Sequence, residues 1–315
     1  MEAHISVLLE PVLKAMNPRA GGRYVDLTLG AGGHSEAILQ ASSPSGELLG
    51  IDRDPRAHAM AAERLAVFGE RFHPVRATFA EFPRVLREHG WTQVDGILLD
   101  AGVSSMQLDE AERGFSFRFD APLDMRMGQD GQTAAEYIDA SSEETLIQIL
   151  REYGEMSGAH RIARRMKEWR AKGELDTTTQ LRVLCEQTVR KESGRSKIHP
   201  ATRVFQALRI AVNDELRQLE TALEAMPAFL APGGVAAVIS FHSLEDRRVK
   251  RAFREIVRPS TPKHLAHLPM DLEADRPDFE LLRDVGPTEE EASENPRARS
   301  ARLRCLRRLD VRSSG

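Results

Sequence analysis

The amino-acid sequence predicts an α/β fold in which a mostly parallel sheet is interrupted by an inserted all-helical domain. Two observations support this fold class. Short apolar runs alternate with helix-like stretches up to residue 99, as expected for consecutive strand–helix–strand units. The next strand candidate begins only about 134 residues later, whereas a parallel crossover needs about a dozen residues. The long interval therefore predicts an insertion between two strands of one sheet.

The first part of the sheet is predicted from four apolar runs, three of which lead directly into glycine or aspartate. Two helices are expected between them. The one over Ser35–Gln40 follows the first run, and the one over Pro55–Phe68 begins with proline, which is favoured at the first position of a helix. The predicted strands are Tyr24–Leu29, Glu47–Ile51, Phe72–Ala77 and Val94–Leu99.

The interval that follows has a helical pattern. Over Ala201–Met226, apolar side chains recur at spacings of one, three or four residues, as one face of an amphipathic helix requires. The sheet is expected to resume afterwards, which divides the chain into a sheet domain of residues 1–108 and 217–315 and a helical insertion of residues 109–216. The other expected elements are helices over Ser142–Tyr153, His160–Lys172, Thr177–Lys191 and Leu244–Ile256, and strands over Gly234–Ser240, Phe279–Arg283 and Leu303–Leu309.

The composition is that of a soluble globular protein, with 41% hydrophobic and 29% charged residues. No apolar run reaches the ~18 residues of a membrane span, and the N-terminal residues lack the pattern of a secretory signal. The two cysteines, Cys185 and Cys305, form no CxxC pair, which disfavours a zinc site or a disulfide framework. We therefore expect a cytoplasmic protein with no membrane partner and no metal.

The net charge of −4 conceals blocks of opposite sign. Ser157–Arg217 holds 14 Lys/Arg against 7 Asp/Glu, and Pro296–Gly315 holds 7 Arg against 1 Asp. Met270–Asn295 holds 10 Asp/Glu against 2 Arg. Basic blocks in an acidic protein are typical of a polyanion partner on one face, and they are equally typical of solvated helix faces. Charge alone leaves both interpretations open.

A glycine-rich loop, Gly30-Ala31-Gly32-Gly33, lies between the first strand and the first helix. Glycines there let the backbone approach a ligand closely. Ser35 stands where the third glycine of a dinucleotide-binding GxGxxG would stand, which disfavours a nicotinamide oxidoreductase. A Walker loop is excluded because no Gly-Lys-Ser/Thr follows. The loop suits a nucleoside cofactor without a pyrophosphate, and a plain structural turn is the alternative.

Three further candidates follow the second, third and fourth strands. Asp52, 22 residues after Gly30, is placed to accept hydrogen bonds from both hydroxyls of a ribose. Asp100 lies near a reacting centre by topology, because ligands of open α/β sheets bind beyond the carboxyl ends of the strands, and it is also placed to cap the next turn. Phe79 would pack either on an adenine ring or in the core beside Phe82.

His242 follows the fifth strand at the same edge of the sheet. It is a candidate base, substrate hydrogen bonder or structural cap, and we favour a structural or substrate-positioning role. Ser243 and Asp246 have the spacing of a capping box, with aspartate in place of the usual glutamate. The sequence contains no GxSxG elbow and no HExxH zinc helix.

Several longer segments resemble the bacterial 16S ribosomal RNA cytosine-N4 methyltransferases. They follow the family's order from residue 4 to about residue 304, so the resemblance covers nearly the whole chain. The matching segments are His4–Glu10 (HISVLLE), Asp26–Ser35 (DLTLGAGGHS), Leu99–Asp109 (LDAGVSSMQLD), Arg113–Phe117 (RGFSF), Pro122–Met127 (PLDMRM), Ser240–Arg247 (SFHSLEDR) and Asn295–Arg304 (NPRARSARLR).

The resemblance implies a class I methyltransferase sheet with an antiparallel last strand. It further implies S-adenosylmethionine as methyl donor and the N4 amine of a cytidine in the decoding region of 16S rRNA as acceptor. Asp100 is a candidate only for the group that orients or deprotonates this amine, because a backbone carbonyl of the following turn would also serve. Carried over residue by residue, with Gly30 added from the loop, the cofactor contacts are Gly30, Gly32, Gly33, His34, Asp52, Phe79, Asp100 and Gln107.

The resemblance also makes 16S rRNA in the small ribosomal subunit the expected partner. The helical insertion and the arginine-rich C-terminal segment are expected to hold it. Two alternatives stay open: a methyltransferase of a different RNA, a protein or a small molecule, and a non-catalytic RNA-binding module. The sequence leaves the target nucleotide and the oligomeric state open, with a homodimer as one expectation. The expected substrate contacts are Arg164, Arg165, Lys191, Arg195, Lys197 and His242.

Overall fold

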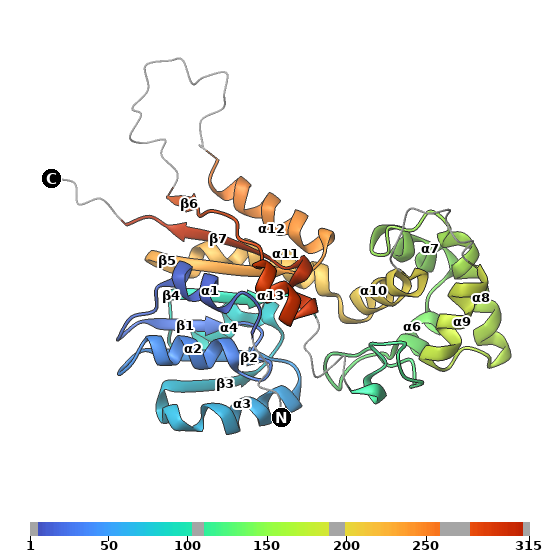
Figure 1. Ribbon diagram of the computed structural model, residues 1–315, viewed down its shortest axis with the longest axis horizontal. Coiled ribbons are helices and arrows are strands. Elements are labelled where there is room, and N and C mark those ends of the chain that lie inside the picture. The colour runs from blue at the N-terminus through green and yellow to red at the C-terminus, as the bar shows by residue number, and fades with distance from the viewer. Residues whose placement is uncertain (1–5, 103–109, 189–198, 259–277, 311–315) are drawn as a thin grey trace, which may run out of the picture. The chain divides into compact units, whose positions relative to one another are not determined.

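The computed structural model describes residues 6–102, 110–188, 199–258 and 278–310 (Figure 1). The chain divides into two compact units, a sheet unit of residues 1–102 and 216–315 and a helical unit of residues 103–215. Within the described ranges, no helix has both the length and the apolar character that a membrane span needs. Four residues named as cofactor or RNA contacts lie outside these ranges: Gln107, Lys191, Arg195 and Lys197.

The sheet unit is built on a seven-stranded sheet with the order β3-β2-β1-β4-β5-β7-β6. Strands β1 to β5 pair in parallel, whereas β7 runs antiparallel between β5 and β6. This topology confirms the predicted mostly parallel sheet with an antiparallel last strand. The strands are β1 (Arg23–Asp26), β2 (Glu47–Asp52), β3 (Phe72–Arg76), β4 (Val94–Asp100), β5 (Leu230–Ser240), β6 (Phe279–Leu281) and β7 (Arg302–Arg308).

Helices cover both faces of the sheet, because successive strand residues point to opposite sides (Figure 1). Leu49 and Ile51 of β2 lie in an apolar cluster with α4, α11 and α12, and Leu48 lies in a second cluster with α1, α2 and α3. The core is therefore a three-layer α/β/α sandwich. Its helices are α1 (Leu9–Met16), α2 (Gly33–Ala41), α3 (Pro55–Leu65), α4 (Phe82–Glu88), α11 (Glu215–Phe229), α12 (Ser243–Ile256) and α13 (Glu289–Glu294).

Two predicted elements differ from the structure. Strand β5 begins at Leu230, four residues before the predicted start at Gly234. The single helix predicted over Ala201–Met226 is wrong, because the chain breaks at Asp214 into α10 (Pro200–Asn213) and α11. Asp214 adopts the left-handed conformation (φ 54°, ψ 37°), which aspartate tolerates better than most residues. The apolar periodicity continues across this break, so the pattern alone could not locate it.

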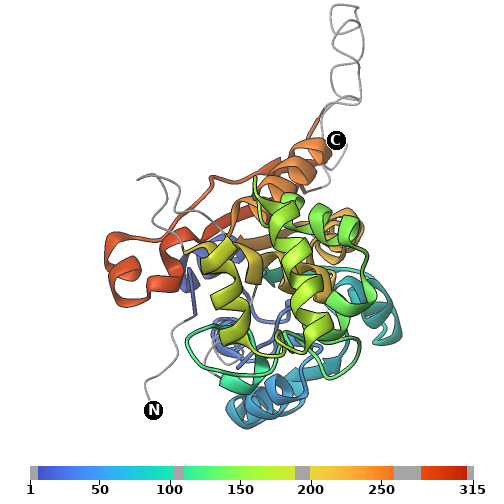
Figure 2. The same ribbon diagram turned by 90° about the vertical axis from the view of Figure 1, so that its right-hand side faces the viewer.

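The helical unit is a bundle with its own apolar core (Figure 2). Helix α7 packs on α8 and α10, while α9 packs on α8 and α10. Capping side chains set two of the helix starts, since Thr133 accepts from the Glu136 N–H and Ser142 from the Thr145 N–H. The helices are α6 (Ala134–Ala140), α7 (Glu143–Glu152), α8 (Ala159–Lys172), α9 (Thr178–Thr188) and α10.

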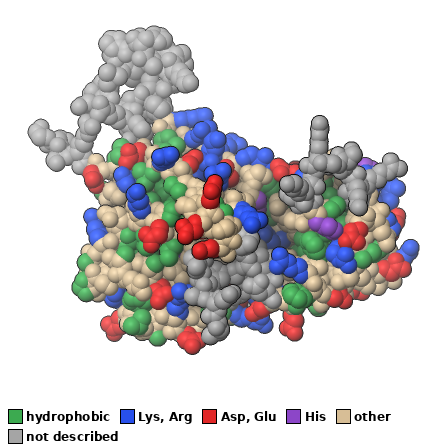
Figure 3. Space-filling view, in the orientation of Figure 1, with side chains coloured by type: hydrophobic (Ala, Val, Ile, Leu, Met, Phe, Trp, Pro, Cys, Tyr) green, Lys and Arg blue, Asp and Glu red, His purple; other side chains and the backbone are tan. Residues whose placement is uncertain are grey.

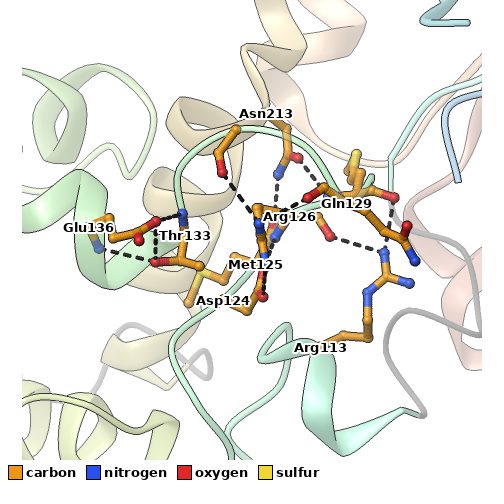
Figure 4. Close-up of polar contacts among 10 residues, drawn as sticks. Arg113, Asp124, Met125, Arg126, Gln129, Thr133, Glu136 and Asn213 are labelled. Carbon is orange, nitrogen blue, oxygen red and sulfur yellow. Dashed lines mark hydrogen bonds and ion pairs between the residues drawn. The ribbon is translucent and has the colours of Figure 1, made fainter.

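A hydrogen-bonded loop before α6 is anchored on the end of α10 (Figure 4). Asn213 donates from Nδ2 to the carbonyl oxygen of Met125 at 2.7 Å, and its Oδ1 accepts from the Met127 N–H at 2.7 Å. Met125 is fully buried and has a positive φ of 60°. Arg113 donates to the carbonyl oxygens of Arg126 and Met127. The loop therefore holds an unfavourable backbone conformation through buried polar contacts.

We expect Asn213→Ala to lower the unfolding free energy of the helical unit by about 3 kcal/mol, because it leaves buried backbone groups of the loop without partners. The unit holds Trp169 and the sheet unit holds the chain's other tryptophan, Trp91. Urea unfolding followed by Trp169 fluorescence in a Trp91→Phe background therefore reports on the helical unit. The exposed Gln148→Ala on α7 is the control and should change stability by less than about 0.5 kcal/mol. Equal effects of the two variants would contradict the anchoring role.

Candidate active site

The glycine loop after β1 needs its glycines for two reasons. Gly30 and Gly32 have positive φ angles of 50° and 79°. A Cβ at Gly32 would also lie 3.2 Å from Cδ1 of Leu65, and one at Gly33 would lie 2.2 Å from Oγ of Ser6. Helix α2 begins at Gly33 without a side-chain cap. Its first N–H groups are therefore left for water or a ligand.

Asp52 at the end of β2 is bonded to this loop. Its Oδ2 accepts from the Gly30 N–H at 2.9 Å, and its Oδ1 accepts from the Asp54 N–H at 2.9 Å. Burial raises the pKa of Asp52, and these two hydrogen bonds oppose the rise. Each carboxylate oxygen keeps a second acceptor site, so Asp52 is fixed in orientation and can accept two more hydrogen bonds.

Asp26 at the end of β1 is a site residue that the sequence interpretation missed. Its side chain is 1% exposed and accepts from Ser35 Oγ at 2.7 Å and from the Thr28 N–H at 3.1 Å. Burial raises its pKa to about 6, against these hydrogen bonds. The sequence feature that could have revealed Asp26 is Ser35. In the sequence it counted only against dinucleotide binding, although its hydroxyl orients the buried carboxylate of Asp26.

Asp100 ends β4 beside the same loop, and its backbone N–H donates to Thr28 Oγ1 at 2.7 Å. Oδ2 lies 3.8 Å from Nδ1 of His34, and the side chain is 26% exposed. Oδ1 is buried and has no hydrogen-bond partner within the described ranges. Burial, with the nearby carboxylates of Asp26 and Glu245, raises the pKa of Asp100 well above its usual value. A hydrogen-bond donor or a cation placed beside this side chain would therefore stabilise it.

His34 is held between the N-terminal segment and Asp100. The ring is buried, and Nε2 lies 3.0 Å from the carbonyl oxygen of Val7. A carbonyl only accepts, so Nε2 carries the proton and Nδ1 is the nitrogen that faces Asp100. This arrangement lets His34 respond to the protonation state of Asp100.

The segment between β5 and α12 lies at the same edge of the sheet. The predicted capping box of Ser243 and Asp246 is wrong, because His242 is the capping residue of α12 and Glu245 is its partner. Glu245 is 2% exposed and accepts from the N–H groups of Phe241 and His242, and its Oε1 lies 2.9 Å from His242 Nε2. Asp246 instead binds Arg304 at 2.7 Å. The helix begins one residue earlier than the Ser-x-x-Asp pattern indicated.

Three further predicted site residues belong to other elements. Phe79 opens a short 3-10 helix after β3 and is half-buried against the core beside α4. In the helical unit, Arg164 lies 3.9 Å from Glu143, and Arg165 lies over the Trp169 ring. These positions leave the predicted roles of Phe79, Arg164 and Arg165 as predictions.

The sheet unit thus gathers carboxylates from three strand ends and one helix start around a glycine loop. Like charges in a partly buried setting raise one another's pKa, and a bound cation would relieve them. The two oriented oxygens of Asp52 favour a pair of hydroxyl donors. The cluster consists of Asp26, Asp52, Asp100 and Glu245.

Comparison with known proteins finds relatives that match nearly the whole chain. A protein from Geobacter sulfurreducens named ribosomal RNA small subunit methyltransferase H is 50% identical over 311 residues, covering 98% of this chain and 99% of the relative. One of the same name from Syntrophotalea carbinolica is 50% identical over 309 residues, covering 97% and 98%. The crystal structure of an rRNA methylase from Streptococcus thermophilus covers 98% of this chain and 100% of its own, with 10% identity and a TM-score of 0.43.

The family assignment rests on the length of the match as well as on identity. The model of the MraW methylase family matches residues 1–309, which include every carboxylate of the cluster and the whole helical unit. The chain belongs to the MraW methylase family.

Proposed function

We propose that this protein transfers a methyl group from S-adenosylmethionine to the exocyclic N4 amine of a cytidine in the decoding region of 16S rRNA. The observation that carries the proposal is Asp100, a half-buried carboxylate at the carboxyl edge of the sheet, next to the glycine loop, whose buried Oδ1 has no hydrogen-bond partner among the described residues. The names of the relatives supply the class of substrate, since both act on small-subunit ribosomal RNA.

The residues present fit S-adenosylmethionine, which supplies an electrophilic methyl group on a positively charged sulfur. Asp52 would hold the ribose hydroxyls with its two remaining acceptor sites. Gly30 and Gly32 would let the ligand approach the backbone, and Phe79 would pack on the adenine. The acidic cluster would offset the sulfonium charge.

Asp100 would act on the acceptor amine. The lone pair of a cytosine amine delocalises into the ring, so a hydrogen-bond acceptor must hold the amine where that lone pair can point at the methyl group. Transfer forms the N4–carbon bond and breaks the sulfur–carbon bond, and the amine must then lose one proton. A carboxylate with a raised pKa is a better proton acceptor than an ordinary aspartate.

The decisive experiment incubates the protein with methyl-labelled S-adenosylmethionine and small subunits that lack the modification, then maps the labelled nucleoside. We expect label in N4-methylcytidine of the decoding region. Label in another RNA base, in protein or in a small molecule would replace the proposed substrate, and failure to bind the cofactor by calorimetry would favour a non-catalytic RNA-binding module.

RNA recognition by the helical unit is part of the proposal. Neutralising Arg164 and Arg165 together should weaken binding of the small subunit by about tenfold and flatten its salt dependence, because phosphate contacts release counterions. Methyl transfer at saturating RNA should stay within about twofold. A cytoplasmic location and a homodimer belong to the proposal as well, and light scattering of the purified protein tests the dimer.

The acidic cluster predicts a pH dependence of cofactor affinity. The pKa of Asp26 is raised to about 6, so between about pH 4 and 6 the native protein holds a proton that the unfolded chain has lost. Stability of the ligand-free protein therefore falls as pH rises through this window. A bound cation lowers the raised pKa values and releases the proton, so affinity for S-adenosylmethionine should rise about tenfold between pH 5 and 7.

S-adenosylhomocysteine is the control ligand. Because it lacks the sulfonium charge, its affinity should rise much less between pH 5 and 7. Calorimetry of both ligands at several pH values measures the difference. An equal pH dependence for the two ligands would show that the cluster does not sense the sulfonium.

A further inference from the structure

Helix α12 presents a basic side to solvent. Its buried side carries Val249 and Phe253, which pack into the apolar core of the sheet unit. The cationic residues recur three and four positions apart, a spacing that places them together on the other side of the helix. We define the basic stripe as Arg247, Lys250, Arg251, Arg254 and, directly after the helix, Arg258.

Four of the five stripe residues are exposed, and Lys250 is half-buried. Figure 3 shows Lys and Arg side chains gathered over the position of α12. Arg251 is 81% exposed and pairs with Glu255 at 3.1 Å. Within the described ranges, the exposed side chains of Arg254 and Arg258 have no hydrogen-bond or ion-pair partner.

Several cations elsewhere are engaged in internal contacts. In the helical unit, Lys167 donates to three backbone carbonyls and Arg170 binds Asp139 and Asp176. The arginine-rich C-terminal segment was expected to hold RNA, yet Arg304 of β7 binds two aspartates and Arg307 binds Glu280. The basic stripe therefore offers phosphate-binding groups at a lower desolvation penalty than these residues do.

A groove of about 390 Å³ opens beside the stripe, between α12 and strands β6 and β7. Lys250 and Arg254 line it from the helix, and the exposed Arg283 lines it from the strand side. Phe253 and Leu281 contribute apolar surface. Arg304 and Asp284 also line the groove, and they pair with each other. The cations of Lys250, Arg254 and Arg283 beside apolar surface suit a sugar–phosphate backbone, because arginine binds phosphate with two parallel hydrogen bonds while the ribose contacts the apolar part.

The position of the stripe relates it to the candidate active site within the same unit. Helix α12 begins next to His242 and Glu245, at the edge of the sheet that holds the carboxylate cluster. From Arg247 to Arg258 the helical rise covers about 17 Å. A nucleic-acid strand with one nucleotide at that edge would meet a line of cations along α12. A solvated helix face would more often mix both signs of charge.

We propose that the basic stripe and its groove form a phosphate-binding surface for the RNA that flanks the target nucleotide. The proposal rests on the proposed function for its ligand, and it places an RNA contact on α12, outside the insertion and the C-terminal segment that were expected to hold RNA. The stripe contributes affinity and orientation of the strand, and it takes no part in methyl transfer.

The test compares charge removal on and off the stripe. Arg251→Ala/Arg254→Ala removes two stripe charges, and Arg251→Lys/Arg254→Lys keeps them. Lys14→Ala/Arg19→Ala is the control, since both residues are exposed and precede β1 at the opposite edge of the sheet. Binding of unmodified small subunits and of protein-free 16S rRNA is measured by filter retention from 50 to 300 mM salt, with cofactor affinity by calorimetry.

We expect the alanine pair to bind both RNA samples about tenfold more weakly, with a salt slope lower by roughly 1.4. The lysine pair should keep the wild-type salt slope, because it keeps both charges, and the control should match the wild type. Cofactor affinity should stay unchanged in every variant. Equal slopes for the alanine pair and the control would overturn the proposal. A loss confined to intact subunits would also overturn it, in favour of a ribosomal protein contact. Methyl transfer by the wild type is measured in a separate assay. If it is absent, the proposed function is refuted, while the comparison of salt slopes for RNA binding still tests the basic stripe.

Discussion

Asp100→Asn should lower kcat for methyl transfer by about 10² to 10³-fold. The amide keeps the size of the side chain and one acceptor oxygen, but it cannot take the proton that the amine loses. Asp100 lies at the end of β4, with one oxygen buried and unpartnered and the other facing His34. Its raised pKa comes from burial and from the carboxylates of Asp26 and Glu245. Single-turnover kinetics with saturating cofactor and small subunits measure the chemical step directly.

Asp246→Asn is the matched control, because that carboxylate follows β5 in the same region but binds Arg304 instead of facing the cluster. Its kcat should stay within about threefold of the wild type. Asp100→Asn should also flatten the pH dependence of cofactor affinity by removing a titrating group. If it keeps kcat within threefold as well, the group that positions the amine is a backbone carbonyl of the turn after β4.

Asp52→Ala should weaken binding of S-adenosylmethionine by about 100-fold. Two hydrogen bonds from ribose hydroxyls to a carboxylate contribute about 1.5 kcal/mol each, and about 1.4 kcal/mol corresponds to a tenfold change in affinity. The carboxylate is already oriented by the N–H groups of Gly30 and Asp54, so little ordering is needed when the ligand binds. Isothermal titration calorimetry gives the dissociation constants.

Asp52 also holds the glycine loop through Gly30, so loss of affinity alone would not identify a ribose contact. The 2′-deoxy analogue of S-adenosylhomocysteine separates the two roles. The wild type should prefer the ribose ligand by about tenfold, and Asp52→Ala should bind both ligands with similar affinity. A variant that weakens both ligands equally and keeps the preference would assign Asp52 to the loop alone.

The strands of the sheet unit and the helices α2, α3 and α12 could be predicted from the sequence, because the elements of a parallel sheet have local sequence patterns. Helices α1, α4 and α13 were not predicted. Strands buried on both faces must be apolar along their length, and the polar residues that follow them mark the carboxyl edge. Asp52 and Asp100 were found in this way. Asp26 was not found, because the neighbouring residues in the sequence do not show whether an acid in an apolar strand is buried or solvated. Its hydrogen bond to Ser35 joins two different elements of the structure.

The helical unit shows a second limit of sequence patterns. Apolar periodicity continues through Asp214, so the sequence predicts one helix where the chain forms two. The break depends on Asn213, whose contacts with Met125 and Met127 span more than 80 residues of chain. No window of neighbouring residues contains both partners of such a bond.

What the sequence by itself determined is the α/β fold class, the helical insertion and the glycine loop with its acidic neighbours, because each depends on local patterns and on spacings along the chain. Only the tertiary structure decided which charges act together. It placed four carboxylates from separate elements around the loop, bound the arginines of β7 to acidic partners, and left the basic stripe of α12 exposed. The physical reason is that the effect of a charge depends on its burial and its neighbours in space, which the fold brings together from distant parts of the chain.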